Sequence, residues 1–406
     1  MKLFRCPCCD HTVFFENQDC ESCGAALAYD PQQNVMLAAA EVSCCANRQF
    51  GVCNWALGSE NNADNSPEFS TENTSEECSE NSPENGNSDL CQSCQLNRYI
   101  PDTSQPELLE SWGKLEVAKR RLIYSLNRLE LPVISKVDDA SSGLSFDFIS
   151  PDQPLPPDAV ATTGHASGRI TINLDEADPV EREKAKESME ERYRTLLGHM
   201  RHEVGHYFWE VLVLPSETEL DAFRQRFGDE QADYGASLET HYNQGAPADW
   251  KDRFVSAYAS SHPWEDWAES WAHYLHLCDT LETAFHYGLS IQPVDANDSL
   301  HGSAAFDPYR CADFEEVVEG CLPVIYAANS LNRSMGQNDL YPFVLVPAVI
   351  EKMAFIHRLL WKQRFEAPAP VSQSPQPQQP EPQPSVSQQP ELQAPPEASQ
   401  TGTINE

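Results

Sequence analysis

Positive charge is scarce in this sequence of 406 residues. It contains 27 Lys and Arg against 63 Asp and Glu, which gives a formal net charge of -36 at pH 7. Because proteins bind a phosphate backbone through clustered Lys and Arg, we expect no nucleic-acid partner. The sequence also lacks the run of roughly 20 apolar residues that a membrane-spanning helix needs, and it begins without the apolar segment of a secretory signal. We therefore expect a cytoplasmic protein without a membrane partner, and its oligomeric state stays open.

Cysteine is almost missing from the greater part of the chain. Of the 14 cysteines, 11 come before residue 95, and Cys278, Cys311 and Cys321 have no partner at close spacing and are expected to be buried thiols. In a sequence without an export signal, such clustering favours metal ligands over disulfides. We predict a small, all-β zinc-ribbon region at residues 1–100. Within it, residues 59–89 are rich in Asn, Ser and Glu and contain no Lys or Arg, which predicts a disordered acidic insertion.

The rest of the chain has two further compositions. Residues 101–365 contain apolar patterns of helical period, such as one long pattern from Val180 to Val213, together with two segments of alternating polarity, 144–149 and 169–174. A few strands followed by long helices predict an α+β domain. Residues 366–406 consist mainly of Pro, Gln, Ser and Glu without an apolar period, and we expect a disordered tail there.

Four of the early cysteines form two pairs with Cys-x-x-Cys spacing, Cys6 with Cys9 and Cys20 with Cys23. Each pair places two thiolates on one tight turn, and two such turns complete a tetrahedral zinc site. Cys8 lies between the members of the first pair and is expected to be a spectator, although it could replace Cys9 if the register differs. Because protein atoms fill all four positions, we predict a structural zinc ion.

A second set of cysteines is less regular. Cys91 and Cys94 form another close pair, and Cys45 and Cys53 are their best remaining partners, with Cys44 as the competitor. The alternative interpretation is that these thiols are small buried apolar side chains. We favour a second structural zinc ion, because a lone pair would leave two thiols unexplained.

The segment His202-Glu203-Val204-Gly205-His206 matches the HExxH motif of zinc peptidases. In a helix, residues four apart lie on one face, so both imidazoles can bind one ion. Glu203 would act as the general base that activates the zinc-bound water. A metzincin would continue with Gly and His at positions 209 and 212, where this chain has Trp209 and Leu212.

The third ligand must therefore come from elsewhere, and a predicted helix that begins near Pro263 offers carboxylates. Glu265 and Glu269 are four residues apart and share a helix face. We assign Glu265 as the third zinc ligand and Glu269 as the carboxylate that accepts a ring N–H from a ligand histidine. Asp266 points about a quarter-turn away and is expected to be a solvated or capping carboxylate. The tryptophans of this segment are also compatible with an amphipathic core helix.

Other histidines lie close to these motifs. We interpret His165 as a loop residue before the second predicted strand and assign His199, three residues before His202, a packing role. His273 and His276 follow Glu269 and are expected to lie in the core or to support the ligands rather than to bind metal.

Several motifs together resemble those of one bacterial family. They are the Cys-rich opening, Cys53-Asn54-Trp55, Gly164-His165-x-x-Gly168-x-Ile170-Thr171-Ile172-Asn173, the HExxH segment and Ser261-His262-Pro263-Trp264-Glu265-Asp266-Trp267-Ala268-Glu269. In these motifs the chain is similar to zinc-binding metallopeptidases with an N-terminal zinc-ribbon region. The resemblance covers residues 1–365 except the acidic insertion. It implies a zincin-like domain with a gluzincin-type catalytic core, whereas the substrates of the family are undefined.

The spacing around Glu265 is also similar to that of lethal-factor-type gluzincins. In those enzymes a Tyr seven residues before the ligand Glu lies near the metal, and a second Glu follows four residues later. Tyr258, Glu265 and Glu269 keep this spacing, which implies that Tyr258 stabilises the oxyanion, although the spacing alone is equally compatible with a core or surface aromatic. The chain differs in length, because 58 residues lie between His206 and Glu265. An extra subregion, 215–252, must therefore lie between the two helices.

These observations predict a zinc-dependent metallopeptidase, a hydrolase with one catalytic and one or two structural zinc ions. The expected substrate is a peptide or protein, which could pair in extended form with the predicted strand at 169–174. A different interpretation is a non-catalytic adaptor whose ribbons and tail recruit protein partners. A DNA-linked protease is disfavoured by the acidic charge.

Overall fold

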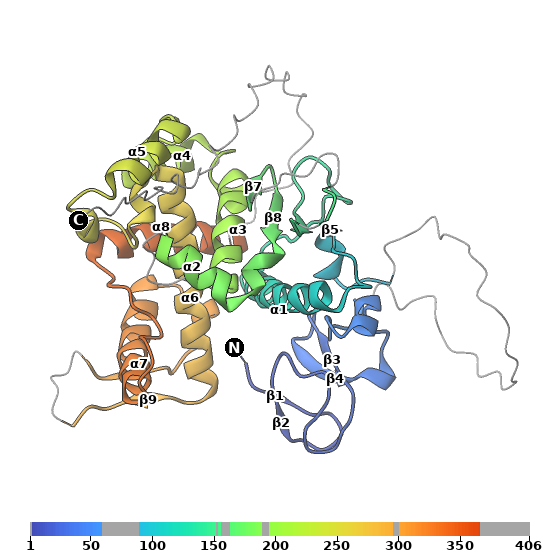
Figure 1. Ribbon diagram of the computed structural model, residues 1–406. Helices are drawn as coiled ribbons and strands as arrows, with labels where there is room; N and C mark the ends of the chain where they lie inside the picture. The colour runs from blue at the N-terminus through green and yellow to red at the C-terminus, as the bar shows by residue number, and fades with distance from the viewer. Residues whose placement is uncertain are drawn as a thin grey trace, which may run out of the picture. The chain divides into compact units, whose positions relative to one another are not determined.

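The computed structural model describes residues 2–58, 89–151, 153–155, 163–188, 195–294 and 300–365, without the side chains of 185–188 (Figure 1). All of these residues belong to one compact unit, residues 1–366. The predicted acidic insertion, apart from Asp89, and the predicted tail at 366–406 lie outside the described residues.

In its described residues, the N-terminal region contains two short antiparallel hairpins and three short 3-10 helices. An aromatic cluster fills its centre: the ring of Tyr29 lies 4.8 Å from that of Phe15 and 5.1 Å from that of Trp55. Phe15 also contacts Tyr124 of the following helix, with 5.3 Å between the ring centroids. The core of this small region therefore continues into the larger one. Its elements are β1 (Phe4–Arg5), β2 (Thr12–Val13), β3 (Leu27–Asp30), β4 (Val35–Ala38), η1 (Ala39–Glu41), η2 (Ala46–Phe50) and η4 (Cys94–Leu96).

A four-stranded sheet follows, with the strand order β5-β6-β8-β7. Its strands are β5 (Asn97–Tyr99), β6 (Ser145–Ile149), β7 (Gly164–Ala166) and β8 (Arg169–Asn173). Strand β8 pairs in parallel with β6 on one side and antiparallel with β7 on the other. The prediction that an extended substrate pairs with β8 is therefore wrong, because β6 pairs along one edge of this strand and β7 pairs with residues 169–171 on the other. The strand at this edge of the sheet is β7, which lies next to β8.

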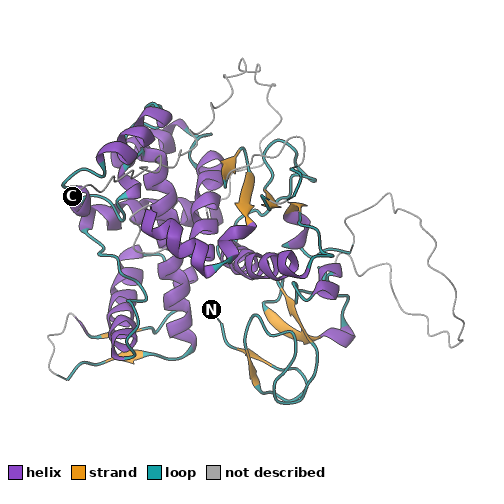
Figure 2. Ribbon diagram, in the orientation of Figure 1, coloured by secondary structure: helices purple, strands orange, loops and turns teal. Residues whose placement is uncertain are grey.

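Helices make up most of the larger region, which confirms the predicted α+β class (Figure 2). The helices are α1 (Pro106–Arg128), α2 (Pro179–Ser188), α3 (Leu196–Leu212), α4 (Glu217–Phe227), α5 (Tyr234–Gln244), α6 (Pro263–His286), α7 (Phe314–Ser334) and α8 (Pro347–Phe365). The shorter elements are η5 (Leu174–Ala177), η6 (Trp250–Asp252), η7 (Tyr258–Ser260), η9 (Pro308–Arg310) and a hairpin of β9 (Ser290–Ile291) with β10 (Gly302–Ser303).

The helix that carries the HExxH segment is shorter than predicted. Thr195 has an extended backbone, with φ -126 and ψ 154, and its side chain accepts a hydrogen bond from the backbone N–H of Gly198. This N-cap satisfies one of the N–H groups that the first helical turn leaves free. The prediction of a single helix from Val180 to Val213 is therefore wrong, since α3 begins only at Leu196 and residues 189–194 lie outside the described residues.

Helix α3 packs closely against α6, and Gly205 makes this approach possible. A Cβ atom on Gly205 would lie 3.0 Å from Cα of Ala268 and 3.2 Å from the side chain of Trp271. The indole N–H of Trp267 donates to the carbonyl oxygen of Gly205 over 2.8 Å, and the ring of Phe208 stacks 5.0 Å from that of Trp271. These contacts set the distance between the two helices that carry the predicted metal ligands.

We predict that Gly205→Ala lowers the free energy of unfolding by about 1–3 kcal/mol, because the added methyl group overpacks the contact with α6. Alanine improves helix propensity, so the matched control is Gly113→Ala in α1, where a Cβ would meet only Val52 at an ordinary 3.5 Å. The control should be as stable as wild type or more stable in urea unfolding. Equal stability of the two variants would contradict the close approach of α3 and α6.

Candidate metal centres

Four sulfur atoms of the N-terminal region gather at one point. The Sγ atoms of Cys6, Cys9, Cys20 and Cys23 lie within 4.8 Å of one another. The distance from Cys6 to Cys23 is 3.7 Å, and so is that from Cys9 to Cys20. A tetrahedral zinc site with Zn–S bonds of about 2.3 Å has sulfur–sulfur edges of about 3.8 Å, so this arrangement fits zinc. Cys8 is exposed and does not belong to the group.

A second group joins cysteines from both sides of the acidic insertion. The Sγ atoms of Cys45, Cys53, Cys91 and Cys94 also lie within 4.8 Å of one another, and all four residues are buried. Cys53 and Cys91 are 3.7 Å apart, again close to a tetrahedral edge. Cys44, the competitor of Cys45, lies 3.7 Å from the carbonyl oxygen of Ala39 and is outside the group. Of the two neighbouring cysteines, only Cys45 reaches the other three sulfur atoms.

The third group combines α3 and α6. We call His202, His206 and Glu265 the ligand cluster: one potential ligand atom from each lies within 4.8 Å of the others. The Nε2 atoms of the two histidines are 3.2 Å apart. Nε2 of His202 lies 2.9 Å from Oε2 of Glu265, and Nε2 of His206 lies 3.5 Å from Oε1. All three residues are buried. Helical spacing places the two imidazoles on one face, and the packing of α6 brings the carboxylate to them.

Glu269 lies behind the ligand cluster. Its Oε1 is 2.8 Å from Nδ1 of His202, and its Oε2 accepts a hydrogen bond of 2.6 Å from the hydroxyl of Ser256. A carboxylate on Nδ1 holds the proton there, which leaves Nε2 free to bind a metal. Burial alone would raise the pKa of Glu269, but the contact with His202 lowers it to about 2, so the carboxylate is ionised.

Glu203 faces His199 rather than a ligand. Its Oε1 lies 3.1 Å from Nε2 of His199, whose Nδ1 is 2.6 Å from Oε2 of Glu176. Burial raises the pKa of Glu203, but the hydrogen bond and charge of His199 and the charges of the two ligand histidines outweigh this and lower it to about 2. Burial lowers the pKa of His199, but the two carboxylates raise it to about 9. The prediction of a packing role for His199 is therefore wrong.

Several aromatic residues surround the ligand cluster, and the ring of Trp264 lies 4.0 Å from that of His206. Tyr258 lies with its ring 6.0 Å from that of His202, and burial raises the pKa of its hydroxyl. Tyr234 of α5 donates a hydrogen bond of 2.8 Å to Oε1 of Glu265. Tyr234 was not among the predicted site residues, because it lies in the extra subregion and no spacing connects it with Glu265. His165 belongs to strand β7 instead of a loop, and its ring lies 6.0 Å from that of His206.

Asp266 is buried and ion-paired, so the prediction of a solvated or capping carboxylate is wrong. Its side chain is 1 % exposed, and its Oδ2 lies 2.6 Å from Nζ of Lys352 on α8. Burial raises the pKa of Asp266 to about 7 despite the opposing charge of Lys352. His273 contacts the hydroxyl of Tyr341 over 2.7 Å in the core.

The charges around the ligand cluster fit a divalent cation. Glu265 and Glu269 bring two carboxylates to the ligand imidazoles, and Glu176 and Glu203 add two more at His199, which supplies one positive charge. Burying carboxylates without compensating positive charge costs free energy. A divalent ion between the three ligand atoms would offset most of the excess negative charge. Two imidazoles and one carboxylate, with a further position open, form the donor set typical of catalytic zinc.

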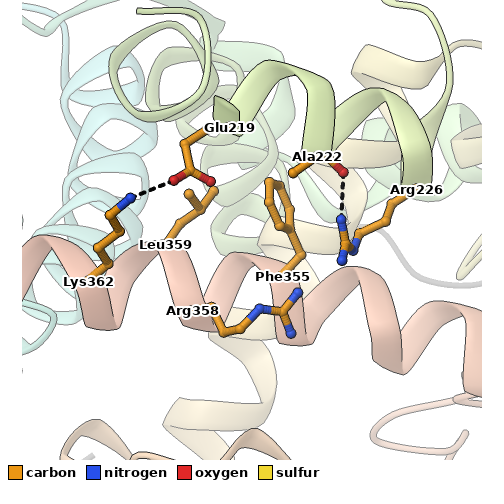
Figure 3. A pocket seen from close by; sticks show the side chains of 7 residues that line it. All are labelled: Glu219, Ala222, Arg226, Phe355, Arg358, Leu359 and Lys362. Atoms are coloured by element: carbon orange, nitrogen blue, oxygen red, sulfur yellow. Dashed lines mark hydrogen bonds and ion pairs between the residues drawn. The ribbon is translucent and has the colours of Figure 1, made fainter. Parts of the chain in front are cut away.

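A separate cavity of about 230 Å³ lies between α4 and α8 (Figure 3). Its walls include Phe355 and Leu359, and Lys362 forms an ion pair of 2.8 Å with Glu219 at its margin. None of its lining residues belongs to the three metal-binding groups. In the described part of the chain, no helix is both long enough and apolar enough to cross a membrane.

Comparisons with known proteins identify two families that this chain matches. Residues 108–359 match the family described as "Putative zinc-binding metallo-peptidase", and residues 3–105 match a zinc-ribbon domain. Uncharacterized proteins of Mycobacterium tuberculosis and Mycobacterium bovis are each 39% identical over 363 residues, which cover 89% of this chain and 95% of theirs. No solved structure matches the chain.

We predict that Cys45→Ser removes one zinc ion per chain and lowers the temperature of unfolding, because a hydroxyl is a poor substitute for a zinc-bound thiolate. Cys44→Ser is the matched control at the neighbouring position and should keep both the zinc content and the stability of wild type. Elemental analysis and thermal unfolding measure the two effects. Equal zinc loss in both variants would contradict the choice of Cys45.

Proposed function

Because this chain belongs to the family of zinc-binding metallopeptidases, with a zinc-ribbon domain at its N-terminus, we propose that it is a zinc-dependent peptidase. The observation that carries this proposal is the ligand cluster with Glu203 beside it. His202, His206 and Glu265 would hold the ion, as in gluzincin-type peptidases. When bound, zinc supplies a Lewis acid that lowers the pKa of water and polarises the peptide carbonyl group.

Glu203 is the proposed general base. It precedes His206 by three residues on α3, is 6 % exposed and is ionised in its surroundings. Its carboxylate would accept a proton from the attacking water and pass it to the amine that leaves when the peptide bond breaks. The contact of Oε1 with His199 leaves Oε2 for the water.

Two tyrosine hydroxyls support the same chemistry in different ways. Tyr258 would donate a hydrogen bond to the oxyanion that forms when water attacks the carbonyl carbon. Tyr234 instead orients Glu265, because its hydroxyl donates to Oε1 of that ligand. An extended peptide would pair with the edge strand β7, which contains His165 next to His206.

The proposal gives both four-cysteine groups a structural role, since four thiolates leave no position open for a substrate. One catalytic and two structural zinc ions would then be bound per chain. All 13 cysteines that the structure describes are free of disulfides, which supports a location in the reducing cytoplasm. The proposed substrates are peptides or proteins.

We expect Glu203→Gln to reduce the cleavage of a peptide library by about 100- to 10,000-fold, because glutamine cannot accept the proton of the water. The zinc content should stay at the wild-type value, since Glu203 is not a proposed ligand. Glu217→Gln, the same change at the exposed first residue of α4, serves as the control and should cleave normally. Mass spectrometry of the products measures both variants. Normal cleavage by Glu203→Gln would rule out this general base.

Elemental analysis separates the three metal-binding groups. The His202→Ala/His206→Ala double variant should contain two zinc ions per chain where the wild type contains three, because the double substitution removes two of the three ligands of one site. If the double variant keeps the full zinc content of wild type, the ligand cluster binds no zinc and the peptidase proposal is wrong.

The two tyrosines should differ in their effects. Tyr258→Phe should lower kcat by about 100- to 1,000-fold, because it removes a donor to the oxyanion, and should leave zinc binding unchanged. Tyr234→Phe should instead weaken zinc binding at the ligand cluster by about 10- to 100-fold, because it frees the carboxylate of Glu265. Kinetics with a cleaved library peptide and competition with a zinc chelator measure these effects. The reverse pattern would exchange the two proposed roles.

A further inference from the structure

A line of three side chains connects the proposed general base with the sheet. Glu176 belongs to η5, directly after strand β8, while His199 and Glu203 lie one turn apart on α3. Oε2 of Glu176 is 2.6 Å from Nδ1 of His199, and Nε2 of His199 is 3.1 Å from Oε1 of Glu203. The side chains of Glu176 and His199 are each 15 % exposed, and that of Glu203 is 8 % exposed. Water therefore screens these contacts little.

The geometry indicates which protons His199 carries. An ionised carboxylate only accepts hydrogen bonds, and a neutral imidazole has a single N–H to donate. His199 lies within hydrogen-bonding distance of a carboxylate at both nitrogens. Both contacts are favourable only if both nitrogens carry a proton. His199 is then an imidazolium whose charge faces two carboxylates.

The far end of the line is fixed in the sheet. Oε1 of Glu176 accepts a hydrogen bond of 2.8 Å from the hydroxyl of Thr163, and the same hydroxyl oxygen accepts one of 3.2 Å from the backbone N–H of Asn173 in β8. Each oxygen of Glu176 therefore has a defined partner. Because Asn173 also pairs with Ile149 of β6, this end of the line is tied to the sheet.

We propose that Glu176 and His199 are positioning residues for Glu203: Glu176 holds a doubly protonated His199, and His199 fixes Oε1 of Glu203 so that Oε2 is aimed at the water. This inference rests on the proposed peptidase function. Without the anchor, the carboxylate of Glu203 could rotate away from the water while the ligand cluster stayed intact. The pair therefore affects the proton transfer and not the binding of metal or substrate.

The test uses Glu176→Gln in the full-length, zinc-loaded protein. The amide can still accept a hydrogen bond from His199, but it carries no charge to hold the second proton. We expect kcat for a peptide that the wild type cleaves to fall by about 10- to 100-fold, as for other groups that orient a catalytic residue. KM and zinc content should not change. Glu181→Gln, on the exposed first turn of the neighbouring helix α2, is the matched control and should behave as wild type.

A second measurement does not depend on cleavage. Nitrogen-15 NMR of histidine-labelled protein should show both ring nitrogens of His199 protonated at neutral pH in the wild type and only one in Glu176→Gln. The signal is assigned by its loss in His199→Gln. A neutral His199 in the wild type would overturn the inference, and so would unchanged kcat in Glu176→Gln. If the wild type cleaves no peptide, the proposed function fails and the positioning role with it, while NMR still decides whether the charged pair exists.

Discussion

The close packing of α3 against α6 is the contact on which the ligand cluster depends. Two imidazoles come from one helix and the carboxylate from the other, and 58 residues lie between His206 and Glu265 in the sequence. The helices approach closely because Gly205 has no side chain at the crossing, and the indole of Trp267 binds its carbonyl oxygen. A larger residue at this position would push Glu265 away from both Nε2 atoms. Gly205 within the HExxH segment therefore allows the close approach of α6, and this approach brings Glu265 to the two histidines.

Helix α6 shows how neighbouring carboxylates acquire different roles. Glu265 and Glu269 point to the histidines of α3, whereas Asp266 points to Lys352 of α8. Each of these carboxylates has its own partner: Asp266 has the ammonium group of Lys352, and Glu269 lies against Nδ1 of His202. Burial of an uncompensated charge costs several kcal/mol, so α6 can carry these carboxylates only where neighbouring elements supply partners for them. For Glu265 that partner would be the metal ion.

Local spacing predicted most of the ligand groups, because helical period and Cys-x-x-Cys turns act over a few residues. The errors concern contacts between distant segments. The interior place of β8 depends on pairing with β7, and the role of His199 depends on Glu176, 23 residues earlier. Tyr234 reaches Glu265 only because the extra subregion folds back over α6. No periodicity in the sequence contains such information.

The zinc-ribbon region is built into the same framework as the ligand cluster. Phe15 and Tyr29 of the ribbon pack against Tyr124 of α1. The hydroxyl of Tyr124 in turn donates to Glu282 of α6, 2.9 Å from Oε1, and Arg128 of α1 binds the same carboxylate over 2.8 Å. Side chains therefore connect the ribbon core, through α1, with the helix that carries Glu265. A module that served only to recruit partners would need no such connection, and these buried contacts favour a ribbon that supports the position of α6.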